Sequence, residues 1–177
     1  MSVDDTRALL RHFLAALAYR TQTALRDAPD DFGSFRAAAG VRSPVELVRH
    51  MTSVLGYART TFIGGTYRPE PLPALTDEVA RFHAMLEDLS RHLSAGSPLL
   101  DGMAWEQLLQ GPFADAMTHA GQLAMLRRLA GTPVPPQNFI AADISAERVG
   151  SDQPLPADPD RIWDEAPPGW RPPPDKL

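Results

Sequence analysis

Three side chains of types that bind transition metals occur in two distant parts of this sequence. Asp115 and His119 lie four residues apart, and His50 lies far upstream in another segment of helical hydrophobic periodicity. Side chains four residues apart share one face of a helix, so Asp115 and His119 are expected to point the same way. If both segments are helices of one bundle, a carboxylate and two imidazoles can converge on a divalent transition metal.

The same spacing also fits a structure that holds no metal. Asp115 can favour the start of its own helix, His119 can hydrogen-bond to it, and His50 can be a hydrogen-bonded core histidine. Gln122, one turn beyond His119, either orients a ligand or forms an ordinary helix-surface or interhelical hydrogen bond. The spacing alone leaves both interpretations open.

The remaining histidines are not expected to be ligands. His12 lies off the apolar stripe of its segment and is expected to face solvent. His83 and His92 have no ligand-type partner at helical spacing and are expected at the boundary between core and surface. Tyr19 and Trp105 can border a pocket, but packing in the core explains both more simply.

Hydrophobic periodicity predicts the elements that must position these residues. Apolar residues recur at spacings of three and four in four segments, expected to be helices at about 4–26, 44–62, 74–93 and 111–130. Ser43, Pro44 and Glu46 form a start signal with a capping box for the second helix. Gly111 is expected to cap the fourth helix, with Pro112 at its first position. Four such helices without alternating strand patterns predict an all-α, antiparallel four-helix bundle.

From residue 143 the character of the sequence changes. Repeated prolines between residues 154 and 174 exclude a long helix or a central strand. We therefore expect a bundle domain at 1–142 and an extended Pro-rich arm at 143–177. Trp163 and Trp170 favour an arm packed on the bundle or on a partner subunit over a freely solvated tail.

Composition limits the classes of function. The chain has 177 residues, no cysteine and a formal net charge of -5, so any metal must be held by nitrogen and oxygen, and a phosphate backbone is a poor partner. No uninterrupted apolar stretch approaches the ~18 residues of a membrane span. The N-terminal residues lack the layout of a secretory signal, so we expect a cytoplasmic protein.

Two segments together resemble the DinB-like superfamily of four-helix bundles. They are Ser-Pro-Val-Glu-Leu-Val-Arg-His-Met at 43–51 and Thr-His-Ala-Gly-Gln-Leu-Ala-Met-Leu-Arg-Arg-Leu-Ala-Gly-Thr-Pro at 118–133. The second segment has the His-x-Gly-Gln run, followed by a Leu-Arg pair and a Gly-x-Pro ending. The resemblance extends over roughly residues 1 to 140, and the order and spacing of its motifs are moderately specific.

The resemblance implies a divalent metal bound by a histidine of the second helix and a histidine pair on the last helix. His50 and His119 fall on these ligand positions, whereas Asp115 stands where many relatives carry the other histidine. The resulting ligand set is His50, Asp115 and His119, with Gln122 as a supporting residue. Two imidazoles and a carboxylate suit Zn, Ni, Fe or Mn.

Some DinB-like proteins resemble thiol-dependent transferases and isomerases. The resemblance therefore implies a metal-dependent enzyme that uses a low-molecular-weight thiol, and we expect a homodimer with a small-molecule substrate. A non-catalytic dimeric module, with a structural or vestigial metal site, is the first alternative. A metal-assisted hydrolase is the second, although no general base can be assigned from the sequence.

Overall fold

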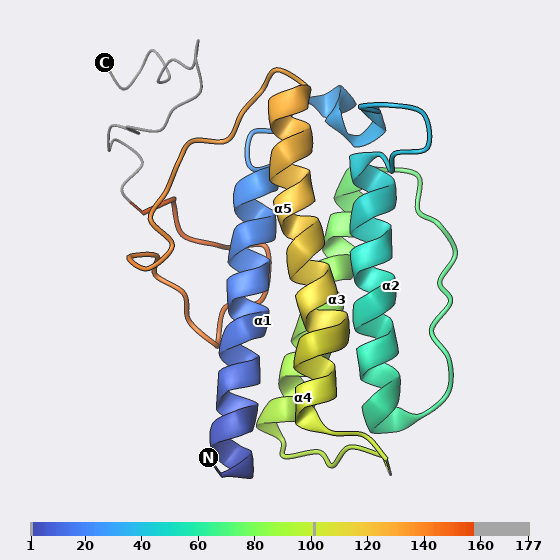
Figure 1. Ribbon diagram of the computed structural model, residues 1–177, viewed down its shortest axis with the longest axis vertical. Helices are drawn as coiled ribbons and strands as arrows, with labels where there is room; N and C mark the ends of the chain where they lie inside the picture. The colour runs from blue at the N-terminus through green and yellow to red at the C-terminus, as the bar shows by residue number, and fades with distance from the viewer. Residues whose placement is uncertain (1, 101, 158–177) are drawn as a thin grey trace.

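The computed structural model describes residues 2–100 and 102–157, within which four long helices form one bundle (Figure 1). The long helices are α1 (Val3–Leu25), α2 (Pro44–Ile63), α3 (Leu75–Ser94) and α5 (Ala114–Leu129). The shorter elements are the 3-10 helix η1 (Asp30–Ser34), helix α4 (Trp105–Leu108) and the π-helical turn η2 (Leu109–Phe113). The described residues include no strand, which confirms the all-α class expected from the sequence.

The four long helices run as two parallel pairs. Helices α2 and α3 begin at the same end of the bundle, where Arg49 pairs with Glu78. At the other end, Leu100, which follows α3, donates its backbone N–H to the carbonyl of Thr61 in α2. Helices α1 and α5 run together in the opposite direction, and Figure 1 shows the linker 64–74 carrying the chain back along the bundle. The antiparallel arrangement expected from the sequence is therefore found between the pairs and not within them, because a long crossover joins α2 to α3.

Apolar side chains of all four long helices meet in one core. Their spacing of three and four places them on the inner face of each helix, as the periodicity predicts. Burial of each such side chain contributes about 1.5–3 kcal/mol. The buried core includes Leu14, Leu17, Met51, Leu55, Phe82, Leu86, Phe113 and Leu123.

Helix α2 starts where the sequence predicts. The backbone N–H of Ser43 donates to the carboxylate of Glu46 at 2.9 Å, which is one half of a capping box. Arg36 approaches the same carboxylate at 2.6 Å. The hydrogen bonds from Arg36 and then from Ser43 lower the pKa of Glu46 to about 2. This start fixes the position of His50, two turns further along α2.

The fourth long helix follows a break at the predicted position, but helical turns also precede this break. The helical segment begins at Trp105, and α4, η2 and α5 follow one another across a kink at Gly111. Gly111 has non-helical backbone angles, so the break falls where the sequence predicts it, and Pro112 follows directly in a π-helical turn that leads into α5. Phe113 is fully buried and stacks on Phe13 of α1 with ring centroids 6.3 Å apart. The kink is thereby held against α1, with Asp115 following in the first turn of α5.

The C-terminal ends of α1 and α5 are joined by Arg127. The sequence predicts only that this side chain complements the dipole of its own helix. In the structure its guanidinium donates to the carbonyl oxygens of Ala24 at 3.1 Å and Arg26 at 2.8 Å. It also donates to the carbonyl of Thr132 at 2.9 Å. Arg127 therefore satisfies carbonyls at the end of α1, which lack partners within their own helix.

The segment that follows α5 lies against α1 and α3 over its described part. Arg11 of α1 pairs with Glu147 at 2.7 Å. Val149 is buried, and its carbonyl accepts a hydrogen bond from His83 of α3 at 2.9 Å. Arg26 donates to the carbonyl of Pro154 at 3.0 Å. An ion pair and hydrogen bonds thus hold this segment against the bundle as far as Pro154. Trp163 and Trp170 lie outside the described residues.

Candidate metal centre

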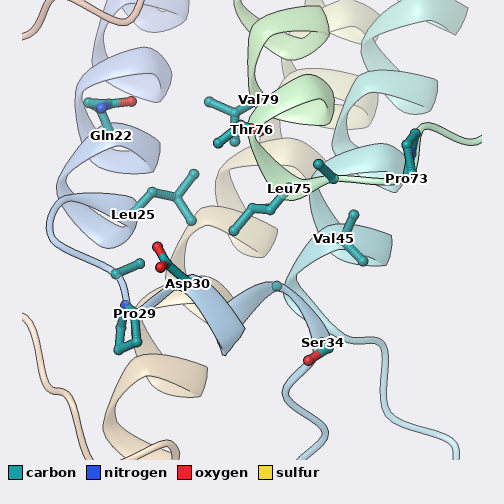
Figure 2. Close-up of a pocket in the computed structure, with 13 residues that line it drawn as sticks. Gln22, Leu25, Pro29, Asp30, Ser34, Val45, Pro73, Leu75, Thr76 and Val79 are labelled. Carbon is teal, nitrogen blue, oxygen red and sulfur yellow. The ribbon is translucent and has the colours of Figure 1, made fainter.

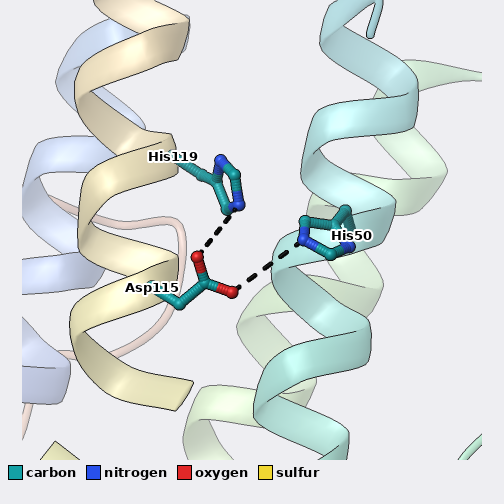
Figure 3. A group of neighbouring side chains, drawn as sticks. All are labelled: His50, Asp115 and His119. Carbon is teal, nitrogen blue, oxygen red and sulfur yellow. Dashed lines mark ion pairs between the residues drawn. The ribbon is translucent and has the colours of Figure 1, made fainter. Parts of the chain in front are cut away.

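The structure brings together the three candidate ligands on facing sides of α2 and α5. His50 extends from α2, and Asp115 and His119 extend from α5, with one oxygen of the carboxylate directed toward each imidazole (Figure 3). Nε2 of His119 lies 3.3 Å from Oδ1 of Asp115, and Nε2 of His50 lies 3.9 Å from Oδ2. One ligand atom from each residue can be chosen so that all lie within 4.8 Å of one another. The group can therefore hold a metal ion.

These separations are close to those around a bound transition metal. Ligand bonds of about 2.0–2.2 Å place neighbouring donor atoms roughly 3–3.5 Å apart. The contact between His119 and Asp115 already meets this spacing, and His50 needs to approach by a distance on the order of 1 Å. A rotamer adjustment of a partly exposed imidazole covers such a shift, so the donor set fits the ion in both geometry and chemistry.

Gln122 fixes the orientation of His119. Its Oε1 accepts a hydrogen bond from Nδ1 of His119 at 2.8 Å. A neutral imidazole that donates from Nδ1 has an unprotonated Nε2, which is the atom directed at Asp115. Gln122, one turn beyond His119, therefore forms a hydrogen bond within α5, and this contact fits both of the interpretations that the sequence left open.

The group is buried on one side and open on the other. The side chain of His119 is 10% exposed, that of His50 31% and that of Asp115 46%. Asp115 is therefore the exposed member of the group, and His119 is the buried one. Structural metal sites are usually closed by four protein ligands, whereas three ligands and an open side are typical of catalytic sites.

Burial and the charge of Arg42 lower the pKa of His50. Burial is the largest cause that lowers the pKa of His50, followed by the charge of Arg42 and the effect of His119, against an opposing effect of Asp115. Metal ligation requires the deprotonated imidazole. The environment of His50 therefore favours the protonation state that a metal ligand needs.

Neither family models nor curated proteins nor solved structures give a significant match to this chain. The function of this chain must therefore be inferred from the candidate ligands and the residues around them. No helix of the described residues has the length and hydrophobicity needed to cross a membrane.

The other histidines are placed away from this group. His12 is exposed, as expected. His92 is half-buried and stacks on Phe62 with ring centroids 5.1 Å apart. His83 is buried more deeply than the boundary position expected, because the segment around Val149 covers it. None of the three belongs to the group of His50, Asp115 and His119, which is called the metal group below.

The two aromatic side chains considered as pocket residues belong to the packing of the bundle. Tyr19 is fully buried, and its hydroxyl donates to Gln137 at 2.7 Å. Trp105 is half-buried and contacts Phe62 and the guanidinium of Arg7. Core packing therefore accounts for the positions of Tyr19 and Trp105, which is the explanation that the sequence favoured.

A groove that the sequence did not reveal begins beside the metal group. It has a volume of about 640 Å³ and lies between loop residues 37–42, Leu47 of α2 and the α5 residues Gln122, Met125, Leu126 and Leu129. Gln122 lines this groove while it bonds to His119, so one residue connects the groove with the candidate ligands. The signal in the sequence was the apolar pair Met125 and Leu129 on the outer side of α5, where both side chains are exposed.

A second cavity lies at the end of the bundle where α2 and α3 begin (Figure 2). Its volume is about 520 Å³, and it is bordered by α1, η1, α2 and the start of α3. Leu25 and Leu75 face its centre, and Asp30 is the carboxylate beside them. Unlike the groove, it has no lining residue that hydrogen-bonds to one of the three candidate ligands. The groove beside Gln122 is therefore the better candidate for a substrate.

Proposed function

We propose that this chain is a DinB-like, divalent-metal-dependent enzyme that uses a low-molecular-weight thiol. The observation that carries the proposal is the meeting of His50 with Asp115 and His119, which places donor atoms from two distant segments within 4.8 Å of one another. Two imidazoles and a carboxylate suit Zn, Ni, Fe or Mn. A bound ion of this kind supplies Lewis acidity, which polarises a substrate oxygen or favours the thiolate form of a thiol.

Side chains of this protein orient the metal ligands and leave the site open to a substrate. Gln122 holds His119 in the tautomer whose Nε2 is free to ligate. The carboxylate of Asp115 lies between the two imidazoles and is 46% exposed, so a substrate can reach the group from its side. The openness of the site supports a reactive centre over a purely structural one.

The thiol must come from outside the chain. The sequence contains no cysteine, so no protein thiol can act as the nucleophile. The family resemblance of segments 43–51 and 118–133 supports a small thiol as cosubstrate. Electrophilic small molecules are the matching second substrate, because a thiolate forms its new C–S bond at an electron-poor carbon.

The non-catalytic module has one observation in its favour. Asp115 already lies within ion-pair distance of both His50 and His119, so the three groups can satisfy one another and fasten α2 to α5. In that case metal binding is dispensable for the fold. Metal analysis and activity measurements separate this alternative from the enzyme.

The first experiment measures metal in protein purified without metal-affinity chromatography. Wild-type protein is expected to contain nearly stoichiometric Zn, Ni, Fe or Mn by elemental analysis, and His119→Ala is expected to lose it. His12→Ala is the matched control, because His12 is an exposed histidine that is not part of the group. Equal metal in His119→Ala and wild type would remove His119 as a ligand and contradict the site.

The second experiment measures turnover of the metal-loaded protein with glutathione and 1-chloro-2,4-dinitrobenzene. In this reaction a C–S bond forms, the C–Cl bond breaks, chloride leaves and the thiol proton passes to the buffer. Asp115→Asn is expected to abolish the protein-dependent rate with the helical circular dichroism unchanged. Hydrolysis of 4-nitrophenyl acetate without thiol would favour the hydrolase, and metal without either activity would favour the module.

The homodimer and the cytoplasmic location expected from the sequence remain predictions. Sedimentation velocity of the full chain measures the first, and fractionation of the producing cells measures the second.

A further inference from the structure

The groove beside the metal group combines an apolar floor with exposed apolar walls. Leu47 and Leu126 form the floor and are buried, with 2% and 5% of their surface exposed. Met125 and Leu129 line it from α5 and are 60% and 59% exposed, and Val41 lines it from the loop at 39%. Apolar surface of this extent inside a concave site is typical of a binding groove.

The loop wall of the groove is held in a defined position. Arg36 donates to the carbonyl of Val41 at 3.0 Å and pairs with Glu46 at 2.6 Å. The same Glu46 carboxylate accepts the backbone N–H of Ser43. Hydrogen bonds therefore fasten the chain on both sides of Arg42. A guanidinium on a loop that hydrogen bonds hold in place loses less conformational entropy on binding a ligand than one on a mobile loop.

Arg42 provides a positive charge at the groove. It lines the groove and is exposed. Among residues 2–100 and 102–157, no carboxylate forms an ion pair with it, although many other arginines in these ranges do have such partners. In a chain with a net charge of -5, an arginine without a carboxylate partner beside an apolar groove is complementary to an anion.

We propose that this groove binds an anionic amphiphile, a small organic acid whose negative group lies at Arg42 and whose apolar chain lies on Met125 and Leu129. That such an acid is a substrate rests on the proposed function, because the groove would place the acid beside the metal ligands His50 and His119. The groove itself can be tested without metal and without turnover.

The direction of the ligand follows from the order of residues along α5. Gln122 contacts His119 at one end of the groove, and Leu129 lies at the other. Seven residues of α-helix rise about 10 Å. The charge of Arg42 lowers the pKa of His50, so it acts on the side of the candidate ligands. The charged end of the ligand therefore belongs near Arg42 on that side, and the apolar end belongs near Leu129. An extended octanoate has a suitable length for this arrangement.

The experiment titrates octanoate into chelator-treated, metal-free protein by isothermal calorimetry. Octylammonium, with the same chain and the opposite charge, is the control ligand. Arg42→Gln is expected to weaken octanoate binding about tenfold, the loss of one charge-assisted hydrogen bond, whereas Arg42→Lys is expected to retain most of it. Arg68→Gln is the matched control variant, because Arg68 is an exposed arginine on the linker 64–74 that does not line the groove.

A second variant tests the apolar wall. Met125→Gln is expected to weaken octanoate several-fold, because an exposed side chain of similar length becomes polar. No measurable octanoate binding by wild type, equal effects of Arg42→Gln and Arg68→Gln, or tighter binding of octylammonium would each overturn the inference. Octanoate binding that depends on Arg42 in a protein without metal affinity would sustain the groove and reject only the proposed enzyme.

Discussion

Gln122 lies one helical turn from His119 and accepts a hydrogen bond from its Nδ1 at 2.8 Å. This contact links two properties of the site. It directs Nε2 of His119 toward Asp115, and it involves a side chain that also lines the groove. The affinity for a metal and the binding of a substrate should therefore both depend on this residue.

Removal of the Gln122 amide should weaken metal binding without removing a ligand. Gln122→Ala frees the His119 ring to rotate and to adopt the other tautomer, so the metal affinity is expected to fall about tenfold. Competition with a chromophoric chelator measures the change. Gln110→Ala, at an exposed glutamine outside the group, serves as the control. Equal metal affinity of Gln122→Ala and wild type would mean that the bond does not orient the ligand.

Glu78 should be essential to the packing of α2 on α3. Its side chain is fully buried, and it accepts hydrogen bonds from Arg49 at 2.6 Å, from the backbone N–H of Leu72 at 2.9 Å and from Arg81. Glu78→Gln leaves two guanidinium groups without their counter-charge, so it is expected to lower the free energy of unfolding by about 3 kcal/mol. Urea denaturation measures this loss.

The neighbouring acid Asp77 provides the control for Glu78. It is exposed in the same turn of α3, so Asp77→Asn is expected to change the free energy of unfolding by less than about 1 kcal/mol, mainly through the helix dipole. If both variants unfolded at the same urea concentration, the buried ion pairs would not stabilise the fold.

The sequence predicts the helices well because their signals are local. Apolar spacing, the capping box of Ser43 with Glu46 and the glycines after α2 each act over a few residues. The pairing of Asp115 with His119 is local in the same sense. The sequence predicts the approach of His50 only on the condition that both segments are helices of one bundle, and the family resemblance favours it, since the position of His50 depends on how α2 packs on α5.

The features that the sequence did not predict depend on contacts between distant residues. The direction of α3 relative to α2 is set by the crossover linker, and no periodicity records it. Arg127 binds carbonyls about a hundred residues away, at the end of α1. Gly111 and Pro112 mark a break between helices, as the sequence predicts, but the stacking of Phe113 on Phe13 of α1 at this kink is a contact between distant residues. The groove at Arg42 likewise forms only when the loop meets α5.

His83 should make the stability of the protein depend on pH. Burial is the largest cause that lowers its pKa below the usual value, with smaller opposing effects from its hydrogen bond to Val149 and from the charge of Glu87. The unfolded chain therefore binds a proton more readily than the folded one. The stabilising contribution of neutral His83 is complete above the unfolded pKa of about 6.5 and decreases as the pH falls from there through the lowered folded pKa.

A variant that cannot titrate isolates this effect. His83→Gln keeps a donor for the Val149 carbonyl and remains neutral, so its urea midpoint is expected to fall less than that of wild type between pH 7.5 and pH 5.5. The same variant at His12, which is exposed, should retain the pH dependence of wild type. Parallel curves for His83→Gln and wild type would exclude His83 as the cause.

Two helical glycines should respond in opposite ways to alanine. A Cβ on Gly56 would overlap the ring of Tyr67, through which the linker 64–74 packs on α2, whereas a Cβ on Gly121 would meet open space. Gly121→Ala is therefore expected to raise the free energy of unfolding by about 1 kcal/mol through helix propensity. Gly56→Ala gains the same propensity but must displace the aromatic ring, so a net loss of about 1–3 kcal/mol is expected.

Thermal and urea unfolding of both variants measure the difference. Tyr67→Ala combined with Gly56→Ala distinguishes a clash from an intrinsic effect at position 56, because removal of the ring leaves room for the new methyl group. The double variant should be no less stable than Tyr67→Ala alone. If Gly56→Ala instead stabilised the protein as much as Gly121→Ala, the linker would not pack against α2 at this position, and the crossover that sets the direction of α3 would need another anchor.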